Sequence, residues 1–80
     1  MKVGTPTEAK LVEIGETIRA ARERVGISQA KLAETIEMQR ENYIRVEKGR
    51  ANVTVETLVR VAEGLGLDVK VTFVRRRSPG

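Results

Sequence analysis

The chain has 80 residues, a net charge of +4 and a pI of about 10.0, and it contains no Cys and no His. This composition excludes disulfides and the common zinc sites and leaves no thiol nucleophile or imidazole base, so we expect no enzyme, no metal and no cofactor. The basic charge suits a polyanionic partner, and the presence of only two aromatic residues, Tyr43 and Phe73, argues against a binder of RNA or single strands.

The first predicted helix begins within residues 5–8, TPTE, which combine an N-cap, a proline at the first helical position and a capping-box glutamate. Gly15 lies inside this helix at a cost of roughly 1 kcal/mol relative to alanine, so a later start near Glu13 is the alternative. Gly26 ends the helix, and residues 1–5 are expected to be disordered. An apolar stripe facing a core is formed by Leu11, Ile14, Ile18, Ala21 and Val25.

Two short helices with almost no linker are predicted between Gly26 and Gly49. Ser28 offers an N-cap hydroxyl to the first of them, in which the apolar residues have helical spacing. The second is anchored by Tyr43 and Val46 and is otherwise polar, and Gly49 ends it in a left-handed conformation. Two such helices form a helix-turn-helix, whose second helix enters the major groove of DNA.

A fourth helix is predicted after a loop at residues 50–53. Thr54 is a suitable N-cap, and Gly64 and Gly66 both favour an end there. The buried stripe of this helix consists of Val55, Leu58, Val59, Ala62 and Leu65.

From Leu67 the hydrophobic period changes to alternation, which predicts a half-buried β-strand over residues 67–75, followed by a flexible basic tail at residues 76–80. A lone strand would leave its backbone groups unpaired, and a core of this size is marginal. We therefore expect the strand to pair with the same strand of a second copy across a two-fold axis. The dimer interface then consists of Val69, Val71 and Phe73.

The run from Ile14 to Gly66 resembles the Xre/Cro and phage-repressor family of helix-turn-helix proteins. Three pieces carry the resemblance in order: IRAARERVGISQAKLAE, IRVEKG and ETLVRVAEGLG. The resemblance implies a mainly α fold, a lambda-repressor-like bundle of four helices in which residues 6–66 form the DNA-binding domain. Many members have a fifth helix where this chain has the strand pattern, so the C-terminal strand is a departure from the family.

The resemblance also implies which side chains contact DNA. Bases would be read from the start of the second helix of the motif, where Arg can bind guanine, Asn adenine and Glu cytosine. The expected base-reading residues are Arg40, Glu41, Asn42 and Arg45. The expected phosphate-binding residues are Ser28, Gln29, Lys31, Gln39, Lys48, Arg50 and Asn52. The alternatives are a solvated surface charge for each lysine and helix capping alone for Ser28. The competing interpretation of the first set is a solvated helix face with an ion pair between Glu41 and Arg45.

Arg22 and Glu47 are expected to form a partly buried, structural ion pair, because related repressors pair an arginine and a glutamate at these positions. The alternative is an exposed pair that contributes little to stability. Two positions depart from the family pattern. Glu37 stands where the turn between the helices often has glycine, and Gln39 replaces the usual Ser or Thr cap of the recognition helix.

Together these features predict a sequence-specific regulator of transcription, a repressor that binds a palindromic operator in double-stranded DNA as a homodimer. The alternative is an antitoxin that neutralises a protein toxin and regulates its own operon. Four helices followed by a strand and a short basic tail resemble the HipB-type antitoxins, which dimerise through that strand and bind a kinase-like toxin. No apolar run approaches the ~20 residues of a membrane span and the N-terminus lacks a signal-peptide pattern, so we expect a cytoplasmic location and no membrane contact.

Overall fold

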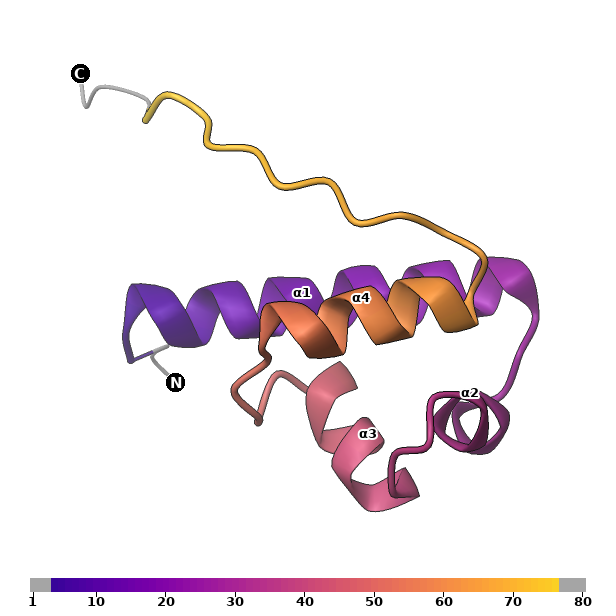
Figure 1. Cartoon of the computed structure of the whole chain (residues 1–80). Helices are drawn as coiled ribbons and strands as arrows, with labels where there is room; N and C mark the ends of the chain where they lie inside the picture. The colour runs from indigo at the N-terminus through magenta and orange to yellow at the C-terminus, as the bar shows by residue number, and fades with distance from the viewer. Residues whose placement is uncertain (1–3, 77–80) are drawn as a thin grey trace.

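The computed structural model describes residues 4–76, which form four α-helices: α1 (Pro6–Val25), α2 (Gln29–Thr35), α3 (Arg40–Glu47) and α4 (Val55–Gly64). α1 and α4 run in the same direction, with α2 and α3 on one side of them and the C-terminal segment on the other (Figure 1). α3 packs against α1 and α2, and α2 also contacts α4. The prediction of a mainly α, four-helix fold with a helix-turn-helix is thus confirmed. None of these four helices combines the length and the apolar character needed to cross a membrane.

The start of α1 is set by a complete capping box. The backbone N–H of Glu8 donates to Oγ1 of Thr5 over 3.1 Å, and the N–H of Thr5 donates to Oε1 of Glu8 over 3.0 Å. These two bonds satisfy donors that have no partner inside the helix. α1 therefore begins at Pro6 and not near Glu13. It ends at Gly26, whose φ of 87° lies in the left-handed region that glycine adopts without steric cost.

Gly15 allows α1 and α3 to approach each other closely. It is buried in the middle of α1, and a Cβ atom at this position would lie 2.3 Å from the carbonyl oxygen of Glu47 and 2.6 Å from that of Val46. Any side chain here would force the two helices apart. The propensity cost of glycine inside a helix is therefore offset by the packing of the last turn of α3.

The core lies between the helices and is centred on two side chains that are completely buried, Leu32 of α2 and Tyr43 of α3. The remaining core residues are Ile18, Ala33, Ile36, Val46, Val61 and Leu65. The predicted apolar stripes extend too far, because Val25, Val55 and Val59 are exposed and no described segment covers them.

Side-chain caps begin two of the three shorter helices. Oγ of Ser28 accepts from the N–H of Lys31 at the start of α2, and Oγ1 of Thr54 accepts from the N–H of Thr57 at the start of α4. Gln39 precedes α3 without making a side-chain cap. Glu37, in the turn between α2 and α3, has a φ of 59°. This is the left-handed conformation in which a side chain costs about 1–2 kcal/mol and which glycine would adopt more easily.

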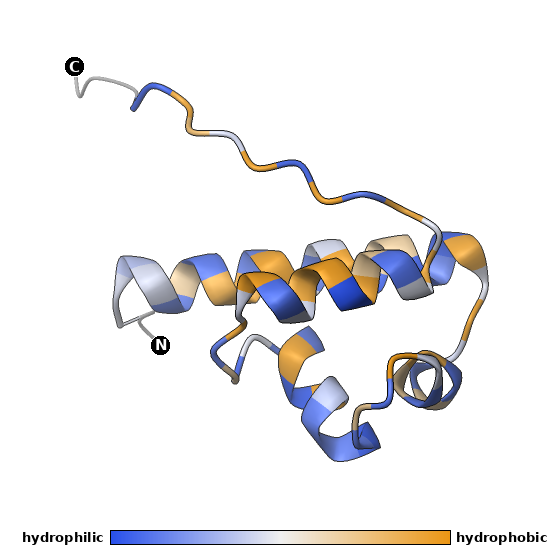
Figure 2. Cartoon of the chain, viewed as in Figure 1, coloured by the Kyte–Doolittle hydropathy of each residue, from blue (hydrophilic) through white to orange (hydrophobic). Residues whose placement is uncertain are grey.

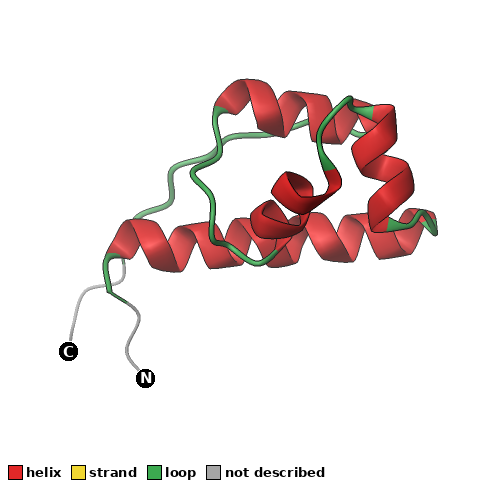
Figure 3. Ribbon diagram, turned by 90° about the horizontal axis from the view of Figure 1, so that it is seen from below, coloured by secondary structure: helices red, strands yellow, loops and turns green. Residues whose placement is uncertain are grey.

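The predicted β-strand over residues 67–75 is not formed in the single chain. Figure 3 shows no strand within residues 4–76, and residues 67–76 are extended without regular structure. The alternation of apolar and polar residues is real, as Figure 2 shows along this segment, but a strand needs a neighbouring strand for its backbone hydrogen bonds and the described chain offers none. The strand on which the HipB-type resemblance depends is therefore not shown by residues 4–76 of the single chain. Residues 1–3 and 77–80, which hold most of the predicted disordered N-terminus and basic tail, lie outside the described residues.

Candidate nucleic-acid interface

The two sides of α3 differ sharply in exposure. Tyr43, Val46 and Glu47 are buried against α1 and α2. The four side chains expected to read bases are all exposed and lie on the first two turns: Arg40, Glu41, Asn42 and Arg45. The structure thus brings these four residues together on one polar, solvent-facing surface.

The buried side of α3 is held by a cluster of polar side chains around one carboxylate. Nε of Arg22 donates to Oε2 of Glu47 over 2.5 Å, and Nη2 donates to Oε1 over 3.2 Å. The Tyr43 hydroxyl also donates to Oε2, and Nε2 of Gln29 donates to Oε1 over 3.0 Å. The Arg22 guanidinium donates further, from Nη1 to the carbonyl oxygen of Ile27 over 2.8 Å. One carboxylate on α3 therefore joins α1 and α2, and Arg22 extends the cluster to the loop before α2.

The electrostatics of the cluster favour a charged pair and a neutral phenol. Burial alone would raise the pKa of Glu47, but the hydrogen bonds from Arg22, Tyr43 and Gln29 outweigh it and hold this pKa below its usual value. The hydrogen bond to Glu47 raises the pKa of Arg22. Burial, and then the hydrogen bond to Glu47, raise the pKa of Tyr43 well above its ordinary value. All three groups therefore keep one protonation state across the neutral range, and the orientation of α3 relative to α1 and α2 is fixed.

The expected phosphate-binding residues are in several different environments. Lys31 forms an exposed ion pair with Glu34 over 3.7 Å. Ser28 caps α2, and Gln39 accepts from Nδ2 of Asn42 over 3.4 Å. All three side chains are exposed, and each already has a partner within the chain.

Two neighbouring cavities are lined by all four of the remaining phosphate-binding candidates. Gln29, Lys48 and Arg50 line a cavity of about 490 Å³ beside the end of α3. Arg50 and Asn52 line a second, of about 460 Å³, together with Arg45. Because Arg50 lines both, the candidates form one continuous surface that reaches the base-reading side of α3.

Arg45 does not pair with Glu41, which was the competing interpretation of this helix face. Its Nη2 donates instead to the carbonyl oxygen of Arg50 over 3.0 Å, in the loop after α3. No ion pair between Glu41 and Arg45 occurs within residues 4–76. The guanidinium is thus held at the edge of the polar surface by the loop backbone.

Two arginines that the sequence pattern did not single out, Arg19 and Arg60, have defined positions in the structure. Arg60 of α4 donates from Nη2 to the carbonyl oxygen of Ile36 and so ties α4 to the turn after α2. Arg19 of α1 lines the cavity that contains Lys48 and Arg50. The only signal for Arg19 was its spacing, because it lies one helical turn before Arg22 and so is on the same side of α1 as the ion pair.

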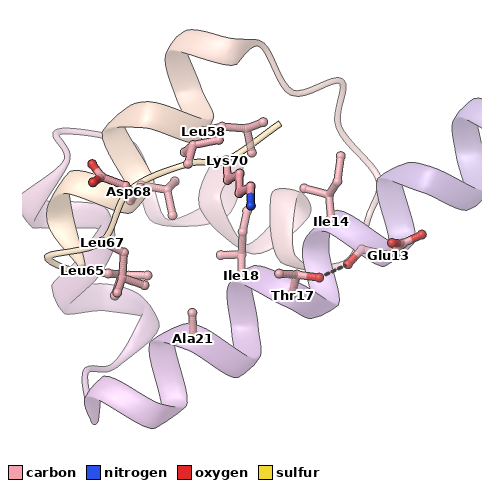
Figure 4. Close-up of a pocket in the computed structure, with 13 residues that line it drawn as sticks. Glu13, Ile14, Thr17, Ile18, Ala21, Leu58, Leu65, Leu67, Asp68 and Lys70 are labelled. Atoms are coloured by element: carbon pink, nitrogen blue, oxygen red, sulfur yellow. Dashed lines mark hydrogen bonds between the residues drawn. The ribbon is translucent and has the colours of Figure 1, made fainter. Parts of the chain in front are cut away.

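A second, apolar surface lies between α1, α4 and the start of the C-terminal segment (Figure 4). The C-terminal segment lies on the side of α1 and α4 away from α2 and α3 (Figure 1). The apolar surface is a groove of about 280 Å³ with Glu13, Asp68 and Lys70 among its polar residues. Its apolar lining includes Ile14, Ile18, Ala21, Leu58, Leu65, Leu67 and Val69. Beyond the groove, Val71, Phe73 and Val74 extend into solvent with exposed fractions of 71%, 98% and 83%.

Comparison with known protein families matches residues 18–71 to the family described as Helix-turn-helix. A similar solved structure is the restriction-modification controller protein C.AhdI from Aeromonas hydrophila, with 32% identity and a TM-score of 0.72, covering 75% of this chain and 91% of that one. Another is the clp gene regulator ClgR from C. glutamicum, with 28% identity and a TM-score of 0.73, covering 85% of each chain. Comparison with curated proteins yields no match.

Proposed function

We propose, because this chain belongs to the helix-turn-helix family, that it is a transcriptional regulator that binds double-stranded DNA in a sequence-specific manner. The proposal depends most on one observation, the exposed polar face of α3 opposite a buried face that fixes its orientation. A recognition helix needs both properties, since base edges are read by side chains whose positions must not vary.

The four exposed residues of α3 offer the chemistry that base reading requires. A guanidinium from Arg40 or Arg45 can donate two hydrogen bonds to guanine, and the Asn42 amide can bond to the adenine edge. The Glu41 carboxylate can accept from the cytosine amino group. The surrounding cations, among them Lys48 and Arg50, would set the register by contacting phosphates, which carry no sequence information.

The similar structures support a regulatory role. One is of a protein named as a controller of restriction-modification and the other of a protein named as a clp gene regulator. We propose that this chain is likewise a gene regulator. We also propose that it represses transcription, because a protein that is bound to an operator blocks access to that stretch of DNA.

We further propose that the chain acts as a homodimer on an inverted repeat. The motivating feature is the segment after α4, in which the apolar side chains of Val71, Phe73 and Val74 are exposed to solvent. A core of this size is marginal, and a second copy would cover these residues at a gain of about 25 cal/mol per Å² of apolar area. The proposed interface consists of Val69, which lines the groove between α1 and α4, and of Val71 and Phe73, which follow it in the exposed segment.

Sedimentation velocity tests the dimer. Wild type is expected to sediment as a dimer at micromolar concentration, and Phe73→Asp is expected to shift it to monomer. Thr72→Asp is the matched control, since it adds the same charge one residue away, on the other side of an alternating segment. A monomeric wild type, or equal effects of the two substitutions, would contradict the proposed interface.

Fluorescence anisotropy tests the class of nucleic acid. Labelled random duplex and the same pool as single strands are titrated with the wild-type protein at several salt concentrations. We expect tighter binding of the duplex, with an affinity that falls as salt rises. Equal or stronger binding of single strands would contradict a major-groove reader.

The antitoxin alternative uses the same exposed C-terminal segment, whose three apolar side chains could instead be covered by a toxin. The antitoxin and the dedicated regulator are expected to differ in the neighbouring gene and in the protein partner. A toxin-like reading frame directly adjacent, together with a stable complex between the two products in which Phe73 becomes buried, would favour this function over that of a dedicated regulator.

A further inference from the structure

Three cations converge on the cavity of about 490 Å³ beside the end of α3. Lys48 and Arg50 follow α3 in the chain, whereas Arg19 comes from the middle of α1. Sequence spacing alone would not group these residues, since Arg19 precedes the helix-turn-helix. The packing of α1 against α3 brings them to one cavity.

The three cations are free to bind an anion. None of them takes part in an ion pair within residues 4–76, and all three are exposed. Of the two carboxylates that line the cavity, Glu47 is neutralised by Arg22, so Glu16 alone opposes three positive charges and leaves a net charge of +2. The cavity is therefore electropositive in spite of its mixed lining.

The cavity also continues into the base-reading surface. Arg50 lines both this cavity and the neighbouring one, which contains Arg45. A ligand that contacts Arg45 and extends beyond it can therefore also contact Arg50, which lines the cavity that holds Arg19. Duplex DNA presents negatively charged phosphates at regular intervals along such a path.

We propose that Arg19 binds a backbone phosphate of duplex DNA in this cavity, together with Lys48 and Arg50. The proposal rests on the function proposed above and adds α1 to the elements that hold the duplex. A guanidinium suits this task because its planar donors match the geometry of phosphate oxygens. The side chain of Gln29 donates a hydrogen bond to Glu47 and forms part of the wall of the site.

Arg19→Ala and Arg24→Ala provide a matched pair of variants. Both remove one exposed positive charge from α1, but Arg24 does not line the cavity and lies about 140° further round the helix. Affinity for a random duplex is measured by anisotropy over a range of salt concentrations. Arg19→Ala should weaken binding roughly threefold to tenfold at low salt and reduce the slope of log K against log salt by about 0.9, as for one lost phosphate contact. Arg24→Ala should change neither by a comparable amount, and Arg19→Lys should retain the wild-type slope.

Equal slopes for the Arg19→Ala and Arg24→Ala variants, with wild type still bound to the duplex, would overturn the proposal and leave the DNA-binding function intact. Absence of duplex binding by wild type would instead contradict the proposed function itself. A titration of wild type and Arg19→Ala with inorganic phosphate, followed by NMR of the backbone amides, separates the two sources of phosphate. No saturation at millimolar phosphate is expected. Saturable binding lost in Arg19→Ala would identify a site for free phosphate and overturn the assignment to DNA.

Discussion

The guanidinium of Arg22 and the carboxylate of Glu47 lie 25 residues apart in the sequence and form a buried ion pair, with 2.5 Å between Nε and Oε2. The exposed fraction is 11% for the arginine side chain and 3% for the glutamate side chain. Since Glu47 lies on the opposite side of α3 from its exposed polar residues, this pair links the stability of the fold to the orientation of the proposed recognition helix.

Removal of the carboxylate should destabilise the protein strongly. Glu47→Ala leaves the Arg22 charge buried without its partner and the Tyr43 hydroxyl without its acceptor, so we expect a loss of roughly 3–5 kcal/mol. Glu13→Ala is the control, because Glu13 forms an exposed ion pair with Lys10 that contributes little. Urea unfolding of both variants measures the difference. Similar midpoints for the two would show that the buried pair is not structural.

The single tyrosine gives a pH-dependent readout of the same cluster. Burial and the bond to Glu47 raise the pKa of Tyr43 in the folded state above its ordinary value of 10.0, so its contribution to stability is complete below that pH and is lost as pH rises above it. We expect tyrosinate absorbance to appear only as the protein unfolds at alkaline pH. Tyr43→Phe should lose the hydrogen bond to Glu47 and also lose this part of the alkaline dependence. Titration of Tyr43 near pH 10 in protein that is still folded would contradict the buried hydrogen bond.

Gly15→Ala distinguishes helix propensity from packing, because the two effects have opposite signs. Propensity alone would stabilise α1 by roughly 1 kcal/mol. The added Cβ, however, would lie 2.3 Å from the carbonyl oxygen of Glu47, so we expect a net loss of stability and a shift of α3. Thermal unfolding by circular dichroism decides the sign. A raised melting temperature would mean that α1 and α3 are less closely packed than described.

Base-reading and phosphate-binding residues should differ in how they affect specificity. Arg40→Ala or Arg45→Ala should cost about 1–3 kcal/mol on the preferred duplex and relax the preference at one base pair. Lys48→Ala should weaken the preferred and a scrambled duplex by similar factors. Parallel titrations of the two duplexes provide the measurement. If the Arg40 and Arg45 variants bind both duplexes as tightly as wild type, α3 is not the recognition helix.

The sequence predicted the fold well where the determinants are local. The capping box at Thr5 and Glu8, the caps at Ser28 and Thr54, and the glycines that end helices each act within a few residues. The positions of the helices could therefore be predicted from the amino-acid sequence alone. The contact between Arg22 and Glu47 spans 25 residues, and it was expected only because of a family resemblance.

What the sequence did not predict depends on contacts between distant parts of the chain. The alternation at residues 67–75 is a correct description of the pattern, but no described segment is placed to form a ladder with it, so no strand results. Likewise, the placement of Arg19 beside Lys48 and of Arg60 beside Ile36 results from helix packing, which periodicity does not report. Val55 and Val59 were assigned to the core from spacing alone, although no described segment packs over them.

The most direct test of a sequence-specific, dimeric DNA-binding regulator is selection of bound sequences from a random duplex library, followed by sequencing. We predict enrichment of an inverted repeat whose half-site centres lie about one helical turn apart, ~34 Å, and loss of that enrichment when Arg40 and Arg45 are both replaced by alanine. Recovery of unenriched sequences by the wild-type protein, or of the same motif by the doubly substituted protein, would contradict this prediction.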